Sequence, residues 1–134
     1  MNGHMLGAGE PLRVRQGGRI PFRLLNASAT ENPLLALTGH SFKVIAMDGS
    51  PVPKPHMVSV LSFAVAERID AIVGTNSPGL WIFGSTLAKE RAMRLGIVGE
   101  YCRKTGAPVW RDAPLETRNF AAFASNARAP EPND

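Results

Sequence analysis

The stretch ENPLLALTGHSFKVIAMDG, from Glu31 to Gly49, constrains the fold more than any other part of the chain. It begins with a short apolar run, Leu34–Leu37, which is typical of a buried strand. A Gly39-His40 step ends this run, and Asp48-Gly49 closes the stretch with a turn signal. We therefore expect two strands here, with a buried histidine between them.

The second of these strands has the alternation of a half-buried strand. Its two faces are predicted to carry Phe42, Val44 and Ala46 on one side and Ser41, Lys43 and Ile45 on the other. Turn residues recur along the rest of the chain, which holds 11 prolines and 13 glycines among its 134 residues. This punctuation favours short strands and turns over long helices.

Further strands are predicted on both sides of this stretch. Leu12–Val14 and Ile20–Asn26 are expected to pair across a hairpin turn at Gln16–Arg19. The proline-rich Ser50–His56 is expected to be an extended loop. The later predicted elements are strands over Met57–Phe63, Leu80–Phe83 and Leu95–Tyr101, and a short helix over Gly84–Met93 with Ser85 as its N-cap. Ala66–Val73 is either a helical turn or a strand, and its alternation and β-branched residues favour a strand. Seven or eight short strands with one helix indicate an all-β sandwich or barrel.

The composition indicates one folded domain. Hydrophobic residues make up 44% of the chain and charged residues 19%, which is typical of a folded protein. The apolar periodicity decays after residue 102. We therefore predict a folded domain over residues 1–102 and a partly mobile C-terminal extension over residues 103–134.

The net charge of +4 comes from scattered basic residues. One group near the N-terminus comprises Arg13, Arg15, Arg19 and Arg23. This group would either meet an anionic partner or form the solvated face of an edge hairpin, and we favour the solvated face. We expect no nucleic-acid partner. No stretch approaches the apolar length of a membrane span, so no membrane partner is expected either.

Single residues with reactive side chains have two interpretations each. His40 is either a functional histidine or a packed residue that bonds to the backbone, and we favour the packed one. Cys102 is either a reactive thiol beside Arg103 and Lys104 or a passive thiol, and we favour the passive thiol. As the single cysteine, it excludes an internal disulfide without fixing the compartment.

Other short patterns are weaker indications of function. Glu67 and Asp70 would form an acid pair only if they shared a face, and strand spacing places them on opposite faces. Asn26-Ala27-Ser28 matches a glycosylation sequon, although the asparagine would equally cap a turn. The Gly7-x-Gly9 pattern is too weak to indicate phosphate binding.

Several motifs occur in an order that resembles a known family. They are FRLLNAS, GHSFKVIAMDG, AERIDAIV, PGLWIFG and MRLGIVGEY. Together they resemble a cupredoxin domain of the laccase-like multicopper oxidases over about residues 2–101. The resemblance implies a cupredoxin-like Greek-key sandwich, in which Asp48 and Asp70 would stabilise turns and loops.

The same resemblance indicates where copper ligands would lie. In copper-bearing domains of this family, three ligand histidines would fall on Pro33, Ala36 and Thr38, and His40 matches a histidine that is not a ligand. The second ligand motif would fall on Gly84, Ser85, Thr86 and Glu90, and the axial methionine on Leu95, with Met93 close by. None of these positions carries the family's ligand.

The donor chemistry of the chain points the same way. A blue-copper site needs a cysteine thiolate and two imidazoles. The chain has one cysteine, Cys102, and three histidines, His4, His40 and His56, which lack close ligand spacing. Three histidines also supply no Ser/His/Asp arrangement. We therefore expect no catalytic, cofactor-binding or metal-binding residue in this chain, with copper confined to the parent family.

The resemblance implies a non-catalytic module of a laccase-like multicopper oxidase. Such a parent oxidises a phenolic or metal-ion substrate and reduces dioxygen to water. The expected partners are copper-bearing cupredoxin domains of the same or a neighbouring chain, or a second copy in a homo-oligomer. The alternative is a stand-alone β-sandwich binding module without redox activity.

The N-terminal sequence MNGHMLGAGE lacks the pattern of a signal peptide. We expect a periplasmic or secreted location if the chain is part of a longer parent. A cytoplasmic location is expected if it is complete.

Overall fold

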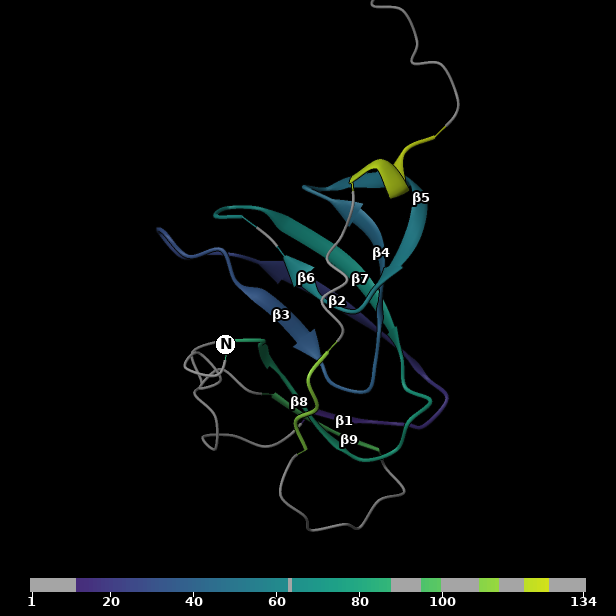
Figure 1. The fold of residues 1–134 in the computed structure, drawn as a ribbon. Coiled ribbons are helices and arrows are strands. Elements are labelled where there is room, and N and C mark those ends of the chain that lie inside the picture. Colours follow the sequence, from purple (N-terminus) through teal and green to yellow (C-terminus); the bar gives the residue numbers. More distant parts are fainter. Residues whose placement is uncertain (1–11, 63, 88–94, 100–108, 114–119, 126–134) are drawn as a thin grey trace, which may run out of the picture.

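The computed structural model describes residues 12–62, 64–87, 95–99, 109–113 and 120–125. These residues form a β-sandwich of a five-stranded and a four-stranded sheet (Figure 1). The described part of the chain thus holds nine strands, two of them only three and two residues long, where the sequence predicts seven or eight. The all-β sandwich itself is confirmed.

The five-stranded sheet has the order β1-β9-β8-β3-β6. These strands are β1 (Leu12–Val14), β9 (Leu95–Gly99), β8 (Leu80–Ser85), β3 (Leu34–Leu37) and β6 (Leu61–Ser62). β1 runs parallel to β9, with Leu12 opposite Ile97, whereas the other neighbours are antiparallel. This sheet therefore joins the first and the last strand of the described chain.

The four-stranded sheet is antiparallel throughout, in the order β2-β7-β4-β5. Its strands are β2 (Arg19–Leu25), β7 (Arg68–Gly74), β4 (Phe42–Met47) and β5 (Ser50–Val58). The predicted turn at Asp48-Gly49 joins β4 to β5. Both residues have positive φ, 50° and 86°, as a type I′ hairpin turn requires.

The hydrophobic core lies between the two sheets. Three aromatic rings form its centre: Phe22 from β2, Phe42 from β4 and Phe83 from β8, with centroids 5.5–6.0 Å apart. The inward residues Ile69, Ala71 and Val73 of β7 are at most 1% exposed. The predicted alternation of β2 and β7 is thus confirmed by the side chains that they bury.

The hairpin predicted between the first two strands is wrong. A turn does lie at Gln16-Gly17, but β1 and β2 belong to different sheets. The backbone N–H of Gly17 donates to the Thr75 carbonyl, and Thr75 in turn donates its N–H to Gly18. The turn is therefore held by Thr75, the residue that follows β7. It carries the chain from one sheet to the other.

The proline-rich segment predicted as a loop is a strand. Ser50–Val58 forms β5, which lies at the edge of the four-stranded sheet. Proline cannot donate to a neighbouring strand, but an edge strand tolerates this loss on its open side. The strand predicted over Met57–Phe63 is divided, since β5 ends at Val58 and Leu61–Ser62 pairs in the other sheet, with Phe63 outside the described residues.

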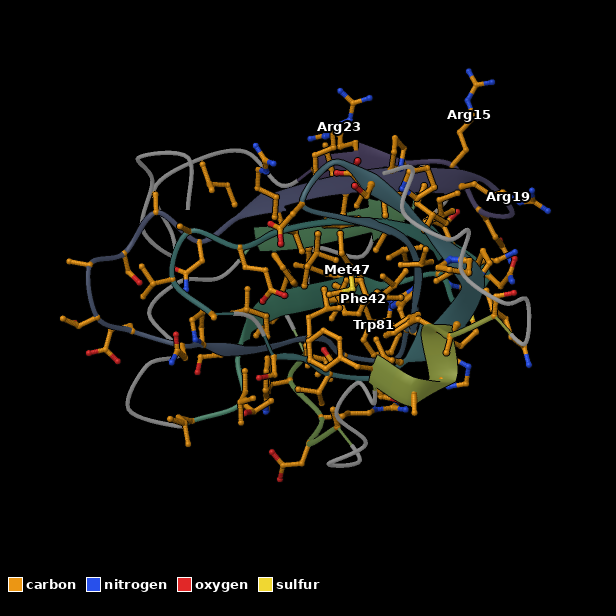
Figure 2. All side chains as sticks on the ribbon, turned by 90° about the horizontal axis from the view of Figure 1, so that it is seen from above. Arg15, Arg19, Arg23, Phe42, Met47 and Trp81 are labelled. Atoms are coloured by element: carbon orange, nitrogen blue, oxygen red, sulfur yellow. The ribbon has the colours of Figure 1, made fainter. Side chains whose placement is uncertain are left out.

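The alternation predicted for β4 holds at Phe42 and Val44 and then changes. The register shifts between Val44 and Ala46, so that Ala46 lies opposite Asp70 and Met47 lies opposite the buried Ile69. Met47, not Ala46, therefore packs against the core (Figure 2). Beyond an inserted residue, the opposite set of alternate side chains faces the core. A prediction from simple alternation does not include this change.

The last predicted elements are described only in part. Gly84 and Ser85 are buried residues at the end of β8, so the predicted helix does not begin at Gly84, and its residues 88–93 lie outside the described part. The predicted strand over Leu95–Tyr101 is described as β9 up to Gly99. Within the described residues, no helix is long and apolar enough to cross a membrane.

The described pieces of the C-terminal extension contact the sandwich. Val109 bridges to Trp81 of β8, and the 3-10 turn η2 (Phe120–Phe123) lies beside β5 (Figure 1). Phe123 is 4% exposed and belongs to the core cluster. The predicted boundary between residues 102 and 103 lies outside the described residues and stays a prediction.

Candidate functional site

His40 lies in the connection that carries the chain from β3 to β4, between the two sheets. Its backbone N–H donates to the Leu37 carbonyl at 3.0 Å, and its Nδ1 lies 3.0 Å from the Thr38 carbonyl oxygen. Because a carbonyl oxygen only accepts, Nδ1 carries the proton of this hydrogen bond. In the neutral ring, Nε2 is then a hydrogen-bond acceptor.

Trp81 of β8 holds this connection in place. The His40 ring meets the Trp81 ring in a T-shaped contact, with centroids 5.6 Å apart. Gly39, at φ +75°, lies so close that a Cβ there would be 3.0 Å from the Trp81 ring. The indole Nε1–H donates to the Ser77 carbonyl at 2.9 Å, so Trp81 links three segments of the chain.

Arg111, from the C-terminal extension, completes this cluster. Its guanidinium carbon lies 5.4 Å from the Trp81 ring centroid, which is a cation–π contact. The neighbouring Val109 exchanges backbone hydrogen bonds with β8, donating to Leu80 and accepting from Ile82. The extension therefore delivers an arginine to the side of the sandwich where His40 lies.

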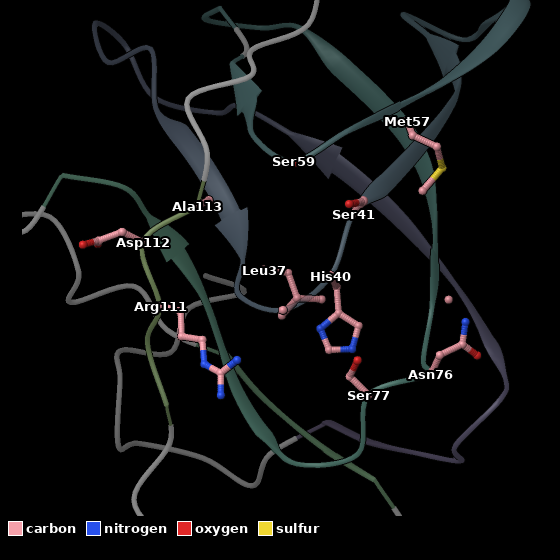
Figure 3. Close-up of a pocket in the computed structure, with 12 residues that line it drawn as sticks. Leu37, His40, Ser41, Met57, Ser59, Asn76, Ser77, Arg111, Asp112 and Ala113 are labelled. Carbon is pink, nitrogen blue, oxygen red and sulfur yellow. The ribbon is translucent and has the colours of Figure 1, made fainter.

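A pocket of about 560 Å³ opens beside His40, and we call it the His40 pocket. Its lining includes Leu37, Met57, Ser41, Asn76, Ser77 and Arg111. In Figure 3 the carboxylate of Asp112 extends away from His40. Asp112 accepts a hydrogen bond from the Trp110 indole at 3.1 Å.

The backbone hydrogen bonds expected for a packed His40 are confirmed. The prediction that it is buried is wrong, because its side chain is half-buried and lines the pocket. His56 is exposed on β5 and contacts the Phe123 ring edge-on at 6.0 Å.

Asn26 caps a turn, as one of its two interpretations predicts. Its side-chain amide donates to the Glu31 carbonyl at 2.7 Å, and its Oδ1 accepts from the backbone N–H and the hydroxyl of Ser28 at 3.1 and 2.7 Å. Asn26 is only 5% exposed. The amide nitrogen of the sequon is thus used inside the folded domain.

Glu67 and Asp48 each serve a turn, whereas Asp70, for which a turn or loop role was expected, lies within a strand. Glu67 accepts a hydrogen bond from the Ala64 N–H at 2.8 Å. Asp48 accepts from the Arg68 N–H at 2.9 Å, as expected for a residue that stabilises a turn. Asp70 lies in β7 opposite Arg23 of β2.

The four N-terminal arginines do not share one hairpin face. Arg13 lies in β1, whereas Arg19 and Arg23 lie in β2 of the other sheet. Figure 2 shows Arg15, Arg19 and Arg23 pointing away from the molecule. The hairpin face that was predicted for this group is therefore wrong, although all four residues are exposed.

Structural side chains occupy the described positions where the resemblance would place copper ligands. Ala36 is fully buried, and Thr38 is 1% exposed. The Thr38 hydroxyl lies 3.1 Å from the Val109 carbonyl, to which it donates. Ser85 is also 1% exposed, and its hydroxyl accepts from the Leu87 N–H at 3.2 Å.

The described residues therefore do not fit a copper site. Nowhere in this part of the chain do three His, Cys, Asp or Glu side chains gather closely enough to hold a metal ion. The remaining candidates, His4, Gly7-x-Gly9, Glu90, Met93 and Cys102, lie outside the described residues. The sequence reasoning missed Trp81, Arg111 and Phe123, although the tryptophan in PGLWIFG was a visible signal.

The fold and these motifs define a cupredoxin domain. The multicopper oxidase family model matches residues 1–103, and the chain belongs to this family. Among curated relatives, it is similar to laccase-3 of Thanatephorus cucumeris, with 37% identity over 65 residues, 48% of the chain and 11% of that protein. It is also similar to multicopper oxidase MmcO of Mycobacterium tuberculosis, with 29% identity over 98% of the chain and 27% of that protein.

Solved structures show the same fold. A blue copper oxidase from Nitrosomonas europaea matches with a TM-score of 0.66 at 24% identity, over 72% of the chain and 32% of its own length. The multicopper oxidase mgLAC matches with a TM-score of 0.68 at 22% identity, over 81% of the chain and 36% of its own length. The chain spans 11% and 27% of the two curated relatives described above.

Proposed function

We propose that this chain is a structural cupredoxin module of a laccase-like multicopper oxidase. In this role it docks against copper-bearing cupredoxin domains and holds them in register. The parent enzyme oxidises its substrate and reduces dioxygen to water with copper that those other domains carry. The module itself contributes packing surfaces and no redox centre.

The observation that carries this proposal is the structural role of the Thr38 side chain. The family pattern would place a copper ligand there, but the Thr38 side chain is buried and its hydroxyl is bonded to Val109 of the C-terminal extension. Ala36, two residues earlier, is packed in the core with no donor atom on its side chain. A blue-copper site needs a thiolate and imidazoles at such positions. Their replacement by packing groups supports an architectural role.

Copper analysis of the purified chain tests the proposal. After incubation with Cu²⁺ and dialysis, we expect far less than stoichiometric copper and no thiolate absorption band near about 600 nm. A Cys102→Ser variant identifies any weak binding that depends on the thiol. The proposal would be contradicted if the unmodified chain bound stoichiometric copper and showed that band, and if the Cys102→Ser variant lost both.

The alternative is a stand-alone binding module, and the His40 pocket is the observation that favours it. Co-expression with separately encoded copper-bearing domains of the same organism distinguishes the two. A docking module should co-purify with those domains and raise their oxidase activity. If the chain elutes alone and changes no activity, the stand-alone module is the better interpretation.

A further inference from the structure

Two polar groups in the His40 pocket lack partners within the described part of the chain. The Nδ1 of His40 is occupied by the Thr38 carbonyl, which leaves Nε2 as an acceptor with no hydrogen bond from any described residue. The guanidinium of Arg111 lies over Trp81, and its five N–H donors make no hydrogen bond or ion pair with the described residues. One pocket therefore holds a cation and an imidazole nitrogen together, and in the neutral ring that nitrogen is a hydrogen-bond acceptor.

One aromatic ring lies beside both groups. Trp81 contacts both of them, with the Arg111 guanidinium carbon 5.4 Å and the His40 ring centroid 5.6 Å from its own ring centroid. A guanidinium held against an aromatic face keeps its planar edge of N–H groups free for a carboxylate. The Thr38 hydrogen bond likewise fixes the orientation of the imidazole.

The pocket has the size and polarity of a site for a small molecule. Its volume of about 560 Å³ falls within the range of ligand pockets, which is about 300–1,000 Å³. Leu37 and Met57 supply apolar surface, and Ser41, Ser59, Asn76 and Ser77 supply further hydrogen-bonding groups. Arg111 is the one permanent cation among the described lining residues, which is too little positive charge for a polyphosphate.

We infer that the His40 pocket binds a small hydroxycarboxylate. The Arg111 guanidinium donates two hydrogen bonds to the carboxylate, and His40 Nε2 accepts a hydrogen bond from the hydroxyl. The hydrocarbon part of the ligand lies over Leu37 and Met57. This assignment involves no covalent step and does not depend on the module being part of an oxidase.

The test uses the full chain, labelled with ¹⁵N, and a series of ω-hydroxycarboxylates from 3-hydroxypropionate to 6-hydroxyhexanoate. We expect saturable amide shifts at Gly39, His40, Ser77 and Asp112, with one chain length binding most tightly. Two compounds of that length serve as controls, the alkanoate without the hydroxyl and the diol without the carboxylate. The alkanoate should bind about tenfold more weakly, the loss expected for one hydrogen bond to a fixed group. The diol should lose at least as much, because it lacks both charge-assisted hydrogen bonds to Arg111.

Matched variants assign the two contacts. Arg111→Gln should weaken the hydroxycarboxylate about tenfold or more and leave binding of the diol unchanged. His40→Asn retains a donor for the Thr38 carbonyl but lacks the Nε2 acceptor, and it should bring the hydroxycarboxylate down to the affinity of the alkanoate. Arg23→Gln removes an exposed arginine on the distant edge strand β2 and should change neither affinity.

Three results would overturn the inference. One is the absence of saturable shifts at the pocket with every member of the series. Another is equal binding of the hydroxycarboxylate by the Arg111→Gln and Arg23→Gln variants, which would reduce the effect to net charge. The last is equal affinity for the alkanoate and the hydroxycarboxylate. Thermal unfolding of each variant confirms that it is folded, and Arg111→Lys replaces Arg111→Gln if that variant unfolds.

Discussion

Two constraints exclude a side chain at Gly39, the backbone conformation and the closeness of Trp81. Its φ of +75° lies in the left-handed region, where a Cβ is disfavoured. A Cβ at this position would also lie 3.0 Å from the ring of Trp81. Gly17 offers a comparison, because its φ of +78° is similar but no atom lies within 4 Å of the added Cβ.

We predict that Gly39→Ala lowers the free energy of unfolding by about 2–4 kcal/mol, from backbone strain and overpacking together. Gly17→Ala should cost only the strain, about 1–2 kcal/mol. Urea denaturation followed by tryptophan fluorescence measures both values. Equal losses in the two variants would show that the Trp81 contact adds nothing to the strain.

At the level of single residues, the sequence identified His40 but not the residues that contact it. The Gly-His step is visible in the chain, and a packed histidine bonding to the backbone is the common outcome for such a residue. Arg111 carries no comparable signal, because its contact with Trp81 depends on where a distant segment returns to the sandwich. The sequence therefore could not predict the pocket that these residues form.

Among the elements, β5 is unusual because it carries Pro51, Pro53 and Pro55 in a strand. It lies at an edge of the four-stranded sheet, where unpaired backbone groups invite pairing with another chain. Proline removes the N–H donor that such pairing needs. We interpret the three prolines as protection of this edge.

Replacement of all three prolines by threonine should therefore promote self-association. Light scattering after size-exclusion chromatography is expected to show dimers or larger species that grow with concentration. Pro78→Thr, in the connection between β7 and β8, is the control and should leave the elution profile unchanged. A monomeric triple variant would contradict a protective role for the prolines.

The elements that the sequence predicted correctly are β2 and β7, which alternate, and β3 and β8, which are short apolar runs. It was wrong where local signals are ambiguous. The Gln16–Arg19 turn has the composition of a hairpin, and only long-range pairing shows that it crosses between sheets. The prolines of β5 indicated a loop because their cost depends on an edge position that composition does not reveal.

For the whole molecule, the C-terminal extension is part of the packed structure where it is described. Phe123 enters the core cluster at 4% exposure, whereas Phe120 in the same 3-10 turn is 63% exposed. Phe123→Ala should therefore lower the free energy of unfolding by about 3 kcal/mol. The Phe120→Ala control should lose no more than about 1 kcal/mol. Chemical denaturation compares them, and similar losses would show that Phe123 is not anchored in the core.

The overall fold was predictable, whereas the docking of the tail was not. Short alternating strands and turn residues indicate a β-sandwich from the chain alone. The segment RNFAAFASNARAPEPND has small residues and prolines without periodicity, so it resembles a mobile tail. Phe123 is identified as its anchoring residue only by its contacts with the core in the folded structure.

The parallel pairing of β1 with β9 has a consequence for synthesis on the ribosome. β1 is the first described strand to emerge, and its hydrogen-bonding partner is the last. A nascent chain therefore exposes an unpaired strand until almost the entire sandwich has been translated. Because such distant contacts form late, the five-stranded sheet is expected to close only after the chain has left the tunnel as far as β9.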